Sequence, residues 1–148
     1  MPSRIAVLLE SAQAERRVAA TPETVRKLIA LGATVAIESG AGREAGIADG
    51  EYEQAGATVA DRATVLAGAD IVLAVQAPDP ATLAGSVPGA WVVAAFDPFR
   101  QRERVTGYAA AGLEALAMDW MPRITRAQSM DILSSQSNLA GYKAVLEA

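Results

Sequence analysis

The sequence contains no cysteine and no histidine, and these two absences narrow the chemistry open to it. Without cysteine there is no disulfide framework, no thiolate metal site and no thiol nucleophile. Without histidine the chain lacks the commonest general base and the commonest metal ligand. Any chemistry must therefore use carboxylates, amides, hydroxyls, arginines or a borrowed cofactor.

The sequence also has few charges and no long apolar run. Only 20% of its 148 residues are charged, 51% are hydrophobic, and the formal net charge is −4. This balance argues against a nucleic-acid partner bound over a basic face. We find no signal peptide and no stretch long enough to span a membrane, so we expect a soluble, intracellular chain. The length and composition predict one folded domain, residues 1–148.

What the sequence does contain is a regular alternation of strand-like and helix-like blocks. Short apolar runs predict strands at residues 5–9, 34–38, 58–59, 70–75, 91–95 and 114–118. Helices are predicted between and after them, at residues 22–31, 49–55, 63–67, 101–111 and 134–146. This alternation implies right-handed crossovers and an α/β fold with a mostly parallel sheet flanked by helices. In such a sheet, ligands bind at the carboxyl ends of the strands.

Three segments carry possible binding features, and each also has a plainer interpretation. Residues 40–46 look like a dinucleotide fingerprint, but no long helix opens onto the glycines, so we interpret them as a structural turn. Residues 15–18 contain arginines that would suit a carboxylate or phosphate, although a solvated loop is favoured. Residues 97–104 carry mixed charges that are typical of a solvated first turn of a helix.

The densest group of polar residues lies directly after the last predicted strand. Its arginine, amide, carboxylate and hydroxyl groups are Arg123, Arg126, Gln128, Asp131, Ser134 and Ser135. In one interpretation Ser134 or Ser135 caps the final helix and Asp131 pairs with an arginine. In the other, glutamine and serine recognise a carboxamide beside a fixed array of arginine donors, as a nicotinamide ring would require. The residue types and their spacing favour neither interpretation.

The segment from Met121 to Tyr142 is very similar to the signature of the alpha subunit of proton-translocating NAD(P) transhydrogenases. The likeness continues through residues 17–22, 31–32, 38–42, 55–57 and 75–78, so it covers essentially the whole chain. The same positions also resemble the related alanine dehydrogenases. This resemblance implies that residues 1–148 are the first of two Rossmann-like domains.

The resemblance also implies a function. Such a component binds NAD(H) in a cleft between its two domains and works as a homodimer. It passes a hydride from NADH to NADP+ held by a partner component, and a membrane domain couples this transfer to proton movement. The component would be cytoplasmic, held at the inner face of the plasma membrane through its partner subunits. Direct hydride transfer needs no catalytic acid or base, which agrees with the missing histidine.

Four cofactor-binding residues are implied by their match in type and spacing: Arg123, Gln128, Asp131 and Ser134. In the family, the corresponding loop lies against the nicotinamide end of the nucleotide. The resemblance assigns Gln128 and Ser134 to orienting the carboxamide and ring, and Arg123 with Asp131 to a polar anchor. No metal ligand is expected.

The sequence departs from its relatives in two places. Alanine dehydrogenases have a lysine where this chain has Gln76, and a histidine after the next strand, where Ala95 and Phe96 stand. These differences favour the transhydrogenase branch. The first loop has Leu8-Leu9-Glu10 in place of the family's usual Pro-Lys-Glu.

The family's dinucleotide-binding domain follows the segment that matches Tyr142 and is not among these 148 residues. Because the contacts to the rest of the nucleotide would lie there, we expect the isolated chain to bind NADH weakly or not at all. Two alternatives stay open. One is a non-catalytic dimerisation or regulatory module, and the other is an alanine-dehydrogenase-like oxidoreductase.

Overall fold

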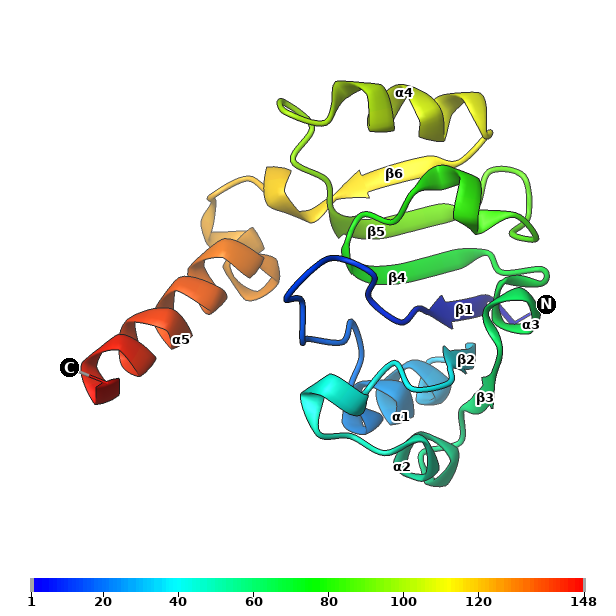
Figure 1. Cartoon of the computed structure of the whole chain (residues 1–148), viewed down its shortest axis with the longest axis horizontal. Coiled ribbons are helices and arrows are strands. Elements are labelled where there is room, and N and C mark those ends of the chain that lie inside the picture. The colour runs from blue at the N-terminus through cyan, green and yellow to red at the C-terminus, as the bar shows by residue number, and fades with distance from the viewer. Residues whose placement is uncertain (1, 148) are drawn as a thin grey trace.

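The computed structural model describes residues 2–147, which form a six-stranded sheet with helices on both faces (Figure 1). The strands are β1 (Arg4–Val7), β2 (Thr34–Glu38), β3 (Thr58–Ala60), β4 (Ile71–Gln76), β5 (Trp91–Ala95) and β6 (Glu114–Ala117). Their order is β3-β2-β1-β4-β5-β6, and every neighbouring pair is parallel. The predicted α/β fold with a parallel sheet is confirmed. The strand order reverses between β1 and β4, which places a topological switch point at their carboxyl ends.

The helices are α1 (Pro22–Ala30), α2 (Asp49–Gln54), α3 (Arg62–Leu66), α4 (Arg102–Ala110) and α5 (Ile132–Glu147). Since alternate strand residues point to opposite faces, β1 contributes to two cores. Val7 packs on the face covered by α1 and α2, and Ala6 packs on the face covered by α3 and α4. No helix within residues 2–147 combines the length and apolar character needed to cross a membrane.

One face of the sheet is covered unevenly. The strand register places Ile37, Val7, Leu73, Val93 and Leu116 in one row across that face. At the β1–β2 end of this row the side chains are fully buried, whereas Leu116 on β6 is 43% exposed. The helices α1 and α2 lie over the β1–β2 end, while α5 extends away from the sheet (Figure 1). The carboxyl ends of β4 and β5 are therefore accessible from this side.

Most predicted boundaries agree with the structure to within one residue, and the larger differences have local causes. The first helix begins at Pro22 because the Thr21 hydroxyl accepts the Thr24 N–H at 3.3 Å, as expected of a threonine cap. The strand β1 ends at Val7 rather than Leu9, because the Leu9 N–H donates to the Glu38 carboxylate at 2.9 Å instead of to a neighbouring strand. The last helix, α5, begins at Ile132 rather than at Ser134, because Asp131 caps it.

Candidate functional site

The segment with the implied cofactor-binding residues leaves the carboxyl end of β6 through two short 3₁₀ helices, η3 (Met118–Trp120) and η4 (Thr125–Met130). Asp119 ties η3 to the end of β5, since its carboxylate accepts the N–H groups of Phe96 at 2.9 Å and Asp97 at 2.8 Å. The segment therefore starts at the edge of the sheet where ligands of parallel sheets bind, as its position in the sequence predicted.

The four residues assigned to the cofactor line a single hollow of about 320 Å³. The residues around it are Arg123, Ile124, Thr125, Gln128, Asp131 and Ser134. Arg123, Gln128 and Ser134 are exposed, whereas Asp131 is buried. The fold thus brings together side chains that come from a loop, a 3₁₀ helix and the first turn of α5.

Asp131 forms the start of α5. Its Oδ1 accepts the N–H of Leu133 at 3.0 Å and of Ser134 at 3.2 Å, and its Oδ2 accepts the Ser134 hydroxyl at 2.6 Å. These bonds, above all the one from the Ser134 hydroxyl, favour the ionised carboxylate and lower the pKa of Asp131. The interpretation in which a serine caps the helix and Asp131 pairs with an arginine is therefore wrong. Asp131 is the cap, and no arginine of residues 2–147 lies within ion-pair distance of it.

The other groups of this hollow suit a ligand that both donates and accepts hydrogen bonds. The exposed amide of Gln128 offers donors and an acceptor, and the exposed guanidinium of Arg123 offers a planar set of donors. The Ser134 hydroxyl donates to Asp131, so its oxygen keeps lone pairs for accepting. A carboxamide on a flat ring needs this combination, so the donor set fits the nicotinamide end of a dinucleotide.

A second hollow of about 310 Å³ lies over the carboxyl ends of β4 and β5. Its lining consists of Arg17–Ala19, Leu73–Val75, Val93–Ala95, Met118, Ile132 and Gln136. The strand residues give it an apolar floor, and the first turn of α5 forms a section of its rim. Arg17 and Gln136 supply its polar side chains.

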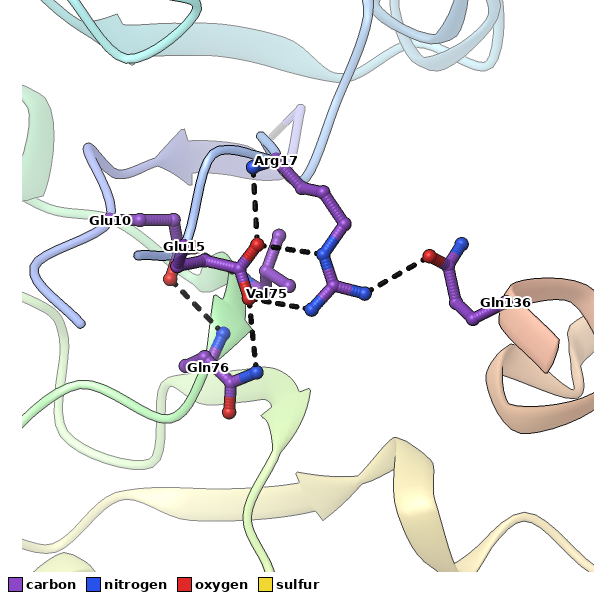
Figure 2. Close-up of polar contacts among 6 residues, drawn as sticks. All are labelled: Glu10, Glu15, Arg17, Val75, Gln76 and Gln136. Atoms are coloured by element: carbon purple, nitrogen blue, oxygen red, sulfur yellow. Dashed lines mark hydrogen bonds and ion pairs between the residues drawn. The ribbon is translucent and has the colours of Figure 1, made fainter. Parts of the chain in front are cut away.

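A polar network lies on the rim of this second hollow (Figure 2). The Glu15 carboxylate accepts hydrogen bonds from Arg17 Nε at 2.7 Å and Arg17 Nη2 at 2.5 Å. The same carboxylate accepts the Gln76 side-chain amide at 3.1 Å. On its other side Arg17 donates from Nη1 to the Gln136 side-chain oxygen at 3.1 Å. The network therefore connects the first loop, β4 and α5.

Glu10 extends the network to the backbone of β4. Its carboxylate accepts the N–H of Val75 at 2.5 Å and of Gln76 at 3.1 Å, where the pairing of β4 with β5 changes register. Burial raises the pKa of Glu10, whereas the hydrogen bonds from Arg17 lower the pKa of Glu15 to about 2. When both acids are ionised, two carboxylates face one guanidinium, so the network carries a net negative charge.

The sequence did not reveal this network. Residues 15–18 were expected to form a solvated loop, and they do lie in a loop in which Arg16 and Arg17 are exposed. The Glu15 side chain differs, since it is only 10% exposed. The two contacts could not be predicted because the partners are distant: Gln76 lies 61 positions from Glu15, and Gln136 lies 119 positions from Arg17. No local pattern could have indicated either contact.

The glycine-rich turn is structural, as predicted. The Gly40 N–H, which a bound phosphate would use, donates to the Asp49 carboxylate at 2.9 Å and 3.1 Å. The Ser39 hydroxyl donates to the same carboxylate at 2.8 Å. The charged segment 97–104 also agrees with its prediction, since Arg102 and Glu103 open α4 with exposed side chains.

Comparison with known proteins gives one family. The family described as "Alanine dehydrogenase/PNT, N-terminal domain" matches residues 6–140. An NAD(P) transhydrogenase subunit alpha polypeptide of Rhodospirillum rubrum is 45% identical over 150 residues, which cover 97% of this chain and 39% of that protein. The chain thus spans well under half the length of this curated relative.

Two solved structures share the fold. The transhydrogenase from Sinorhizobium meliloti matches with a TM-score of 0.92 at 48% sequence identity, over 97% of this chain and 43% of that one. An L-alanine dehydrogenase matches with a TM-score of 0.72 at 33% identity, over 78% of this chain and 32% of that one.

Proposed function

The chain belongs to the alanine dehydrogenase/PNT N-terminal domain family, and we propose that it is the amino-terminal portion of the NAD(H)-binding component of an NAD(P) transhydrogenase. The observation that carries this proposal is the hollow in which Arg123, Gln128, Asp131 and Ser134 meet. Similarity to two proteins named as transhydrogenases, along nearly all of the chain, supports it. The chain spans 39% of the relative from Rhodospirillum rubrum. The transhydrogenase activity is therefore proposed for the whole protein, of which this chain would form one part.

In this proposal the hollow receives the nicotinamide end of NAD(H). Bound NADH supplies a hydride that passes directly to NADP+, so the chain has to supply position and electrostatics rather than a proton carrier. Gln128 orients the carboxamide through its own amide, and the Ser134 hydroxyl oxygen accepts a hydrogen bond beside it. Arg123 anchors the polar oxygens of the ligand. Asp131 acts through the helix cap, because it fixes the position of Ser134.

The proposal extends to the partners. NADP(H) would be bound by a separate component, and a membrane domain would couple hydride transfer to proton movement. The component would be a homodimer held at the inner face of the plasma membrane. A second dinucleotide-binding domain would contact the adenosine and pyrophosphate of NAD(H).

An alanine-dehydrogenase-like activity is the second candidate, since an L-alanine dehydrogenase shares the fold and the second hollow has an arginine on its rim. Two features disfavour it. Gln76 carries no charge where alanine dehydrogenases carry a lysine, and Glu15 already occupies two donor groups of Arg17. Turnover of pyruvate and ammonium with NADH by the full-length protein would favour this alternative over hydride transfer to NADP+.

Replacing Gln128 by alanine in the full-length protein, assembled with its NADP-binding component, tests the proposal. Removal of the amide leaves the carboxamide without its orienting partner, so we expect the hydride-transfer rate from NADH to NADP+ to fall by about tenfold or more. The matched control is Gln54→Ala, which removes an exposed amide at the end of α2. A Gln128→Ala rate equal to that of the control would remove Gln128 from the site.

A further inference from the structure

The helix α5 touches the rest of the domain only near its start. None of its residues is buried, and it extends away from the sheet (Figure 1). Towards its end, Leu139 is 60% exposed and Val145 is 78% exposed. Its first turn differs, because Ile132 and Gln136 lie one helical turn apart and both line the second hollow. The position of this turn over the sheet therefore depends on few contacts.

One hydrogen bond joins this turn to the sheet domain. Among residues 2–147, the bond from Arg17 Nη1 to the Gln136 side-chain oxygen, at 3.1 Å, is the only side-chain hydrogen bond between α5 and residues 2–120. The remaining side-chain hydrogen bonds at the helix start stay within the segment and are accepted by Asp131 and Ile132.

The guanidinium of Arg17 is itself held rigidly. Two of its nitrogens donate to the Glu15 carboxylate, which forms the forked pair that restricts an arginine most strongly. Glu15 is fixed in turn by the Gln76 amide at the end of β4. Figure 2 shows the resulting path from β4 through Glu15 and Arg17 to Gln136 on α5. Because the Arg17 guanidinium is held in place, its Nη1 fixes the position of the Gln136 side chain that accepts the hydrogen bond.

We propose that Arg17 is a positioning residue, which bridges Glu15 and Gln136 and thereby holds the first turn of α5, with Asp131 and Ser134, over the carboxyl end of the sheet. This inference rests on the proposed function where it concerns the nicotinamide. The bridge brings the first loop of the chain into the site, although the loop contributes no side chain to the first hollow.

The surroundings of Arg17 suit a bridge better than an anion site. Glu15 takes up its Nε and Nη2, and Gln136 takes up its Nη1. Glu10 and Glu15 together bring two carboxylates to one guanidinium. A carboxylate ligand would have to displace Glu15 and enter a region that already carries negative charge.

The absence of cysteine allows a direct test of the bridge. Two introduced cysteines, Glu53→Cys on α2 and Asn138→Cys on α5, replace exposed residues and accept spin labels at defined sites. Pulsed electron paramagnetic resonance then measures the distribution of distances between helix and sheet domain. We expect a narrow distribution in the labelled parent and a broader or shifted one after Arg17→Met or Gln136→Leu.

Two further variants separate the bridge from general damage. Gln136→Glu keeps an acceptor for Arg17 and should keep the narrow distribution. Ser137→Leu makes the same kind of polar-to-apolar change one residue further along, on an exposed position, and should also keep it. An unchanged distribution in both Arg17→Met and Gln136→Leu would overturn the bridge. Broadening in Ser137→Leu equal to that in Gln136→Leu would do the same.

A kinetic measurement tests the consequence for the site. The variants Arg17→Met and Gln136→Leu are measured in the full-length protein with its NADP-binding component. Misplacement of the first turn of α5 should lower kcat by about tenfold or more, because the nicotinamide loses its orientation. KM for NADH should change little, because the contacts to the rest of the nucleotide are kept. Gln136→Glu, which keeps an acceptor for Arg17, should have the kcat of the wild type. A broadened distance distribution with unchanged kcat would overturn the positioning role. If Gln128→Ala has no effect either, the nicotinamide site proposed around Gln128 fails, while the spin-label result still decides the bridge.

Discussion

Asp131 is the only buried charged residue within residues 2–147, being 8% exposed. Both of its carboxylate oxygens accept hydrogen bonds from the first turn of α5. A buried carboxylate needs such partners, because an unpaired one would lose its hydration without compensation. The aspartate therefore has a structural reason for its place, and the exposed Arg123, Gln128 and Ser134 are the residues left to contact a ligand.

Glu15 provides a residue-scale prediction about pH. Its folded-state pKa is lowered to about 2, so its bonds stabilise the fold above its unfolded-state pKa, and this stability is lost as the pH falls towards the folded-state value. We expect the free energy of unfolding, from urea titrations, to fall between roughly pH 5 and pH 2, and Glu15→Gln to make this fall smaller. Glu10, whose pKa is raised by burial, contributes with the opposite sign.

The control for this measurement is Glu114→Gln, which changes an exposed acid on the edge strand β6. It should leave the acid-induced loss of stability as it is in the wild type. The prediction is wrong if Glu15→Gln and Glu114→Gln show the same pH dependence.

At the scale of elements, the turn between β2 and α2 depends on a glycine for a reason of space. A Cβ at Gly42 would lie 2.8 Å from the Ile47 carbonyl oxygen and 2.8 Å from Tyr52 Cε2, and the Tyr52 ring is fully buried. We expect Gly42→Ala to lower the free energy of unfolding by about 1–3 kcal/mol, since a packed backbone and ring cannot give way cheaply.

Gly50 is the matched control, because a Cβ there meets no atom within 4 Å. Gly50→Ala should be neutral or stabilising by less than about 1 kcal/mol, since alanine reduces the freedom of the unfolded chain. Thermal and urea unfolding of both variants decide the point. Equal stability of Gly42→Ala and Gly50→Ala would show that the turn can relax.

Elements whose signals are local could be predicted from the sequence. The strands β2 and β5 have the predicted bounds, and α1 begins at the Thr21-Pro22 signal because capping needs only neighbouring residues. The start of α5 was misplaced because the sequence indicated Ser134 and Ser135 as the candidate caps, and only the fold decides that Asp131 is the cap. The Arg17–Gln136 contact could not be predicted, because it depends on how the whole sheet brings two distant segments together.

At the scale of the whole molecule, two hollows of different character lie at the carboxyl edge of the sheet. One hollow is polar and formed by the loop and helix that follow β6, and the other has an apolar floor on β4 and β5. Gln136 and Ser134 lie on the same helix turn, but they line different hollows. The two sites therefore share α5, and any movement of this helix changes both.

The isolated 148-residue chain should bind NADH poorly. The hollow near Arg123 has a volume of about 320 Å³, which suits one end of a dinucleotide, and ligands normally bury most of their surface. The glycine turn offers no phosphate site, since Asp49 holds the Gly40 N–H. Without contacts to the adenosine and pyrophosphate, little binding energy remains to fix the nicotinamide. We expect isothermal titration of the chain with NADH to show no micromolar Kd, whereas the full-length protein should bind. A micromolar Kd for the chain alone, lost in Gln128→Ala, would mean that these residues form the whole site rather than one wall of it.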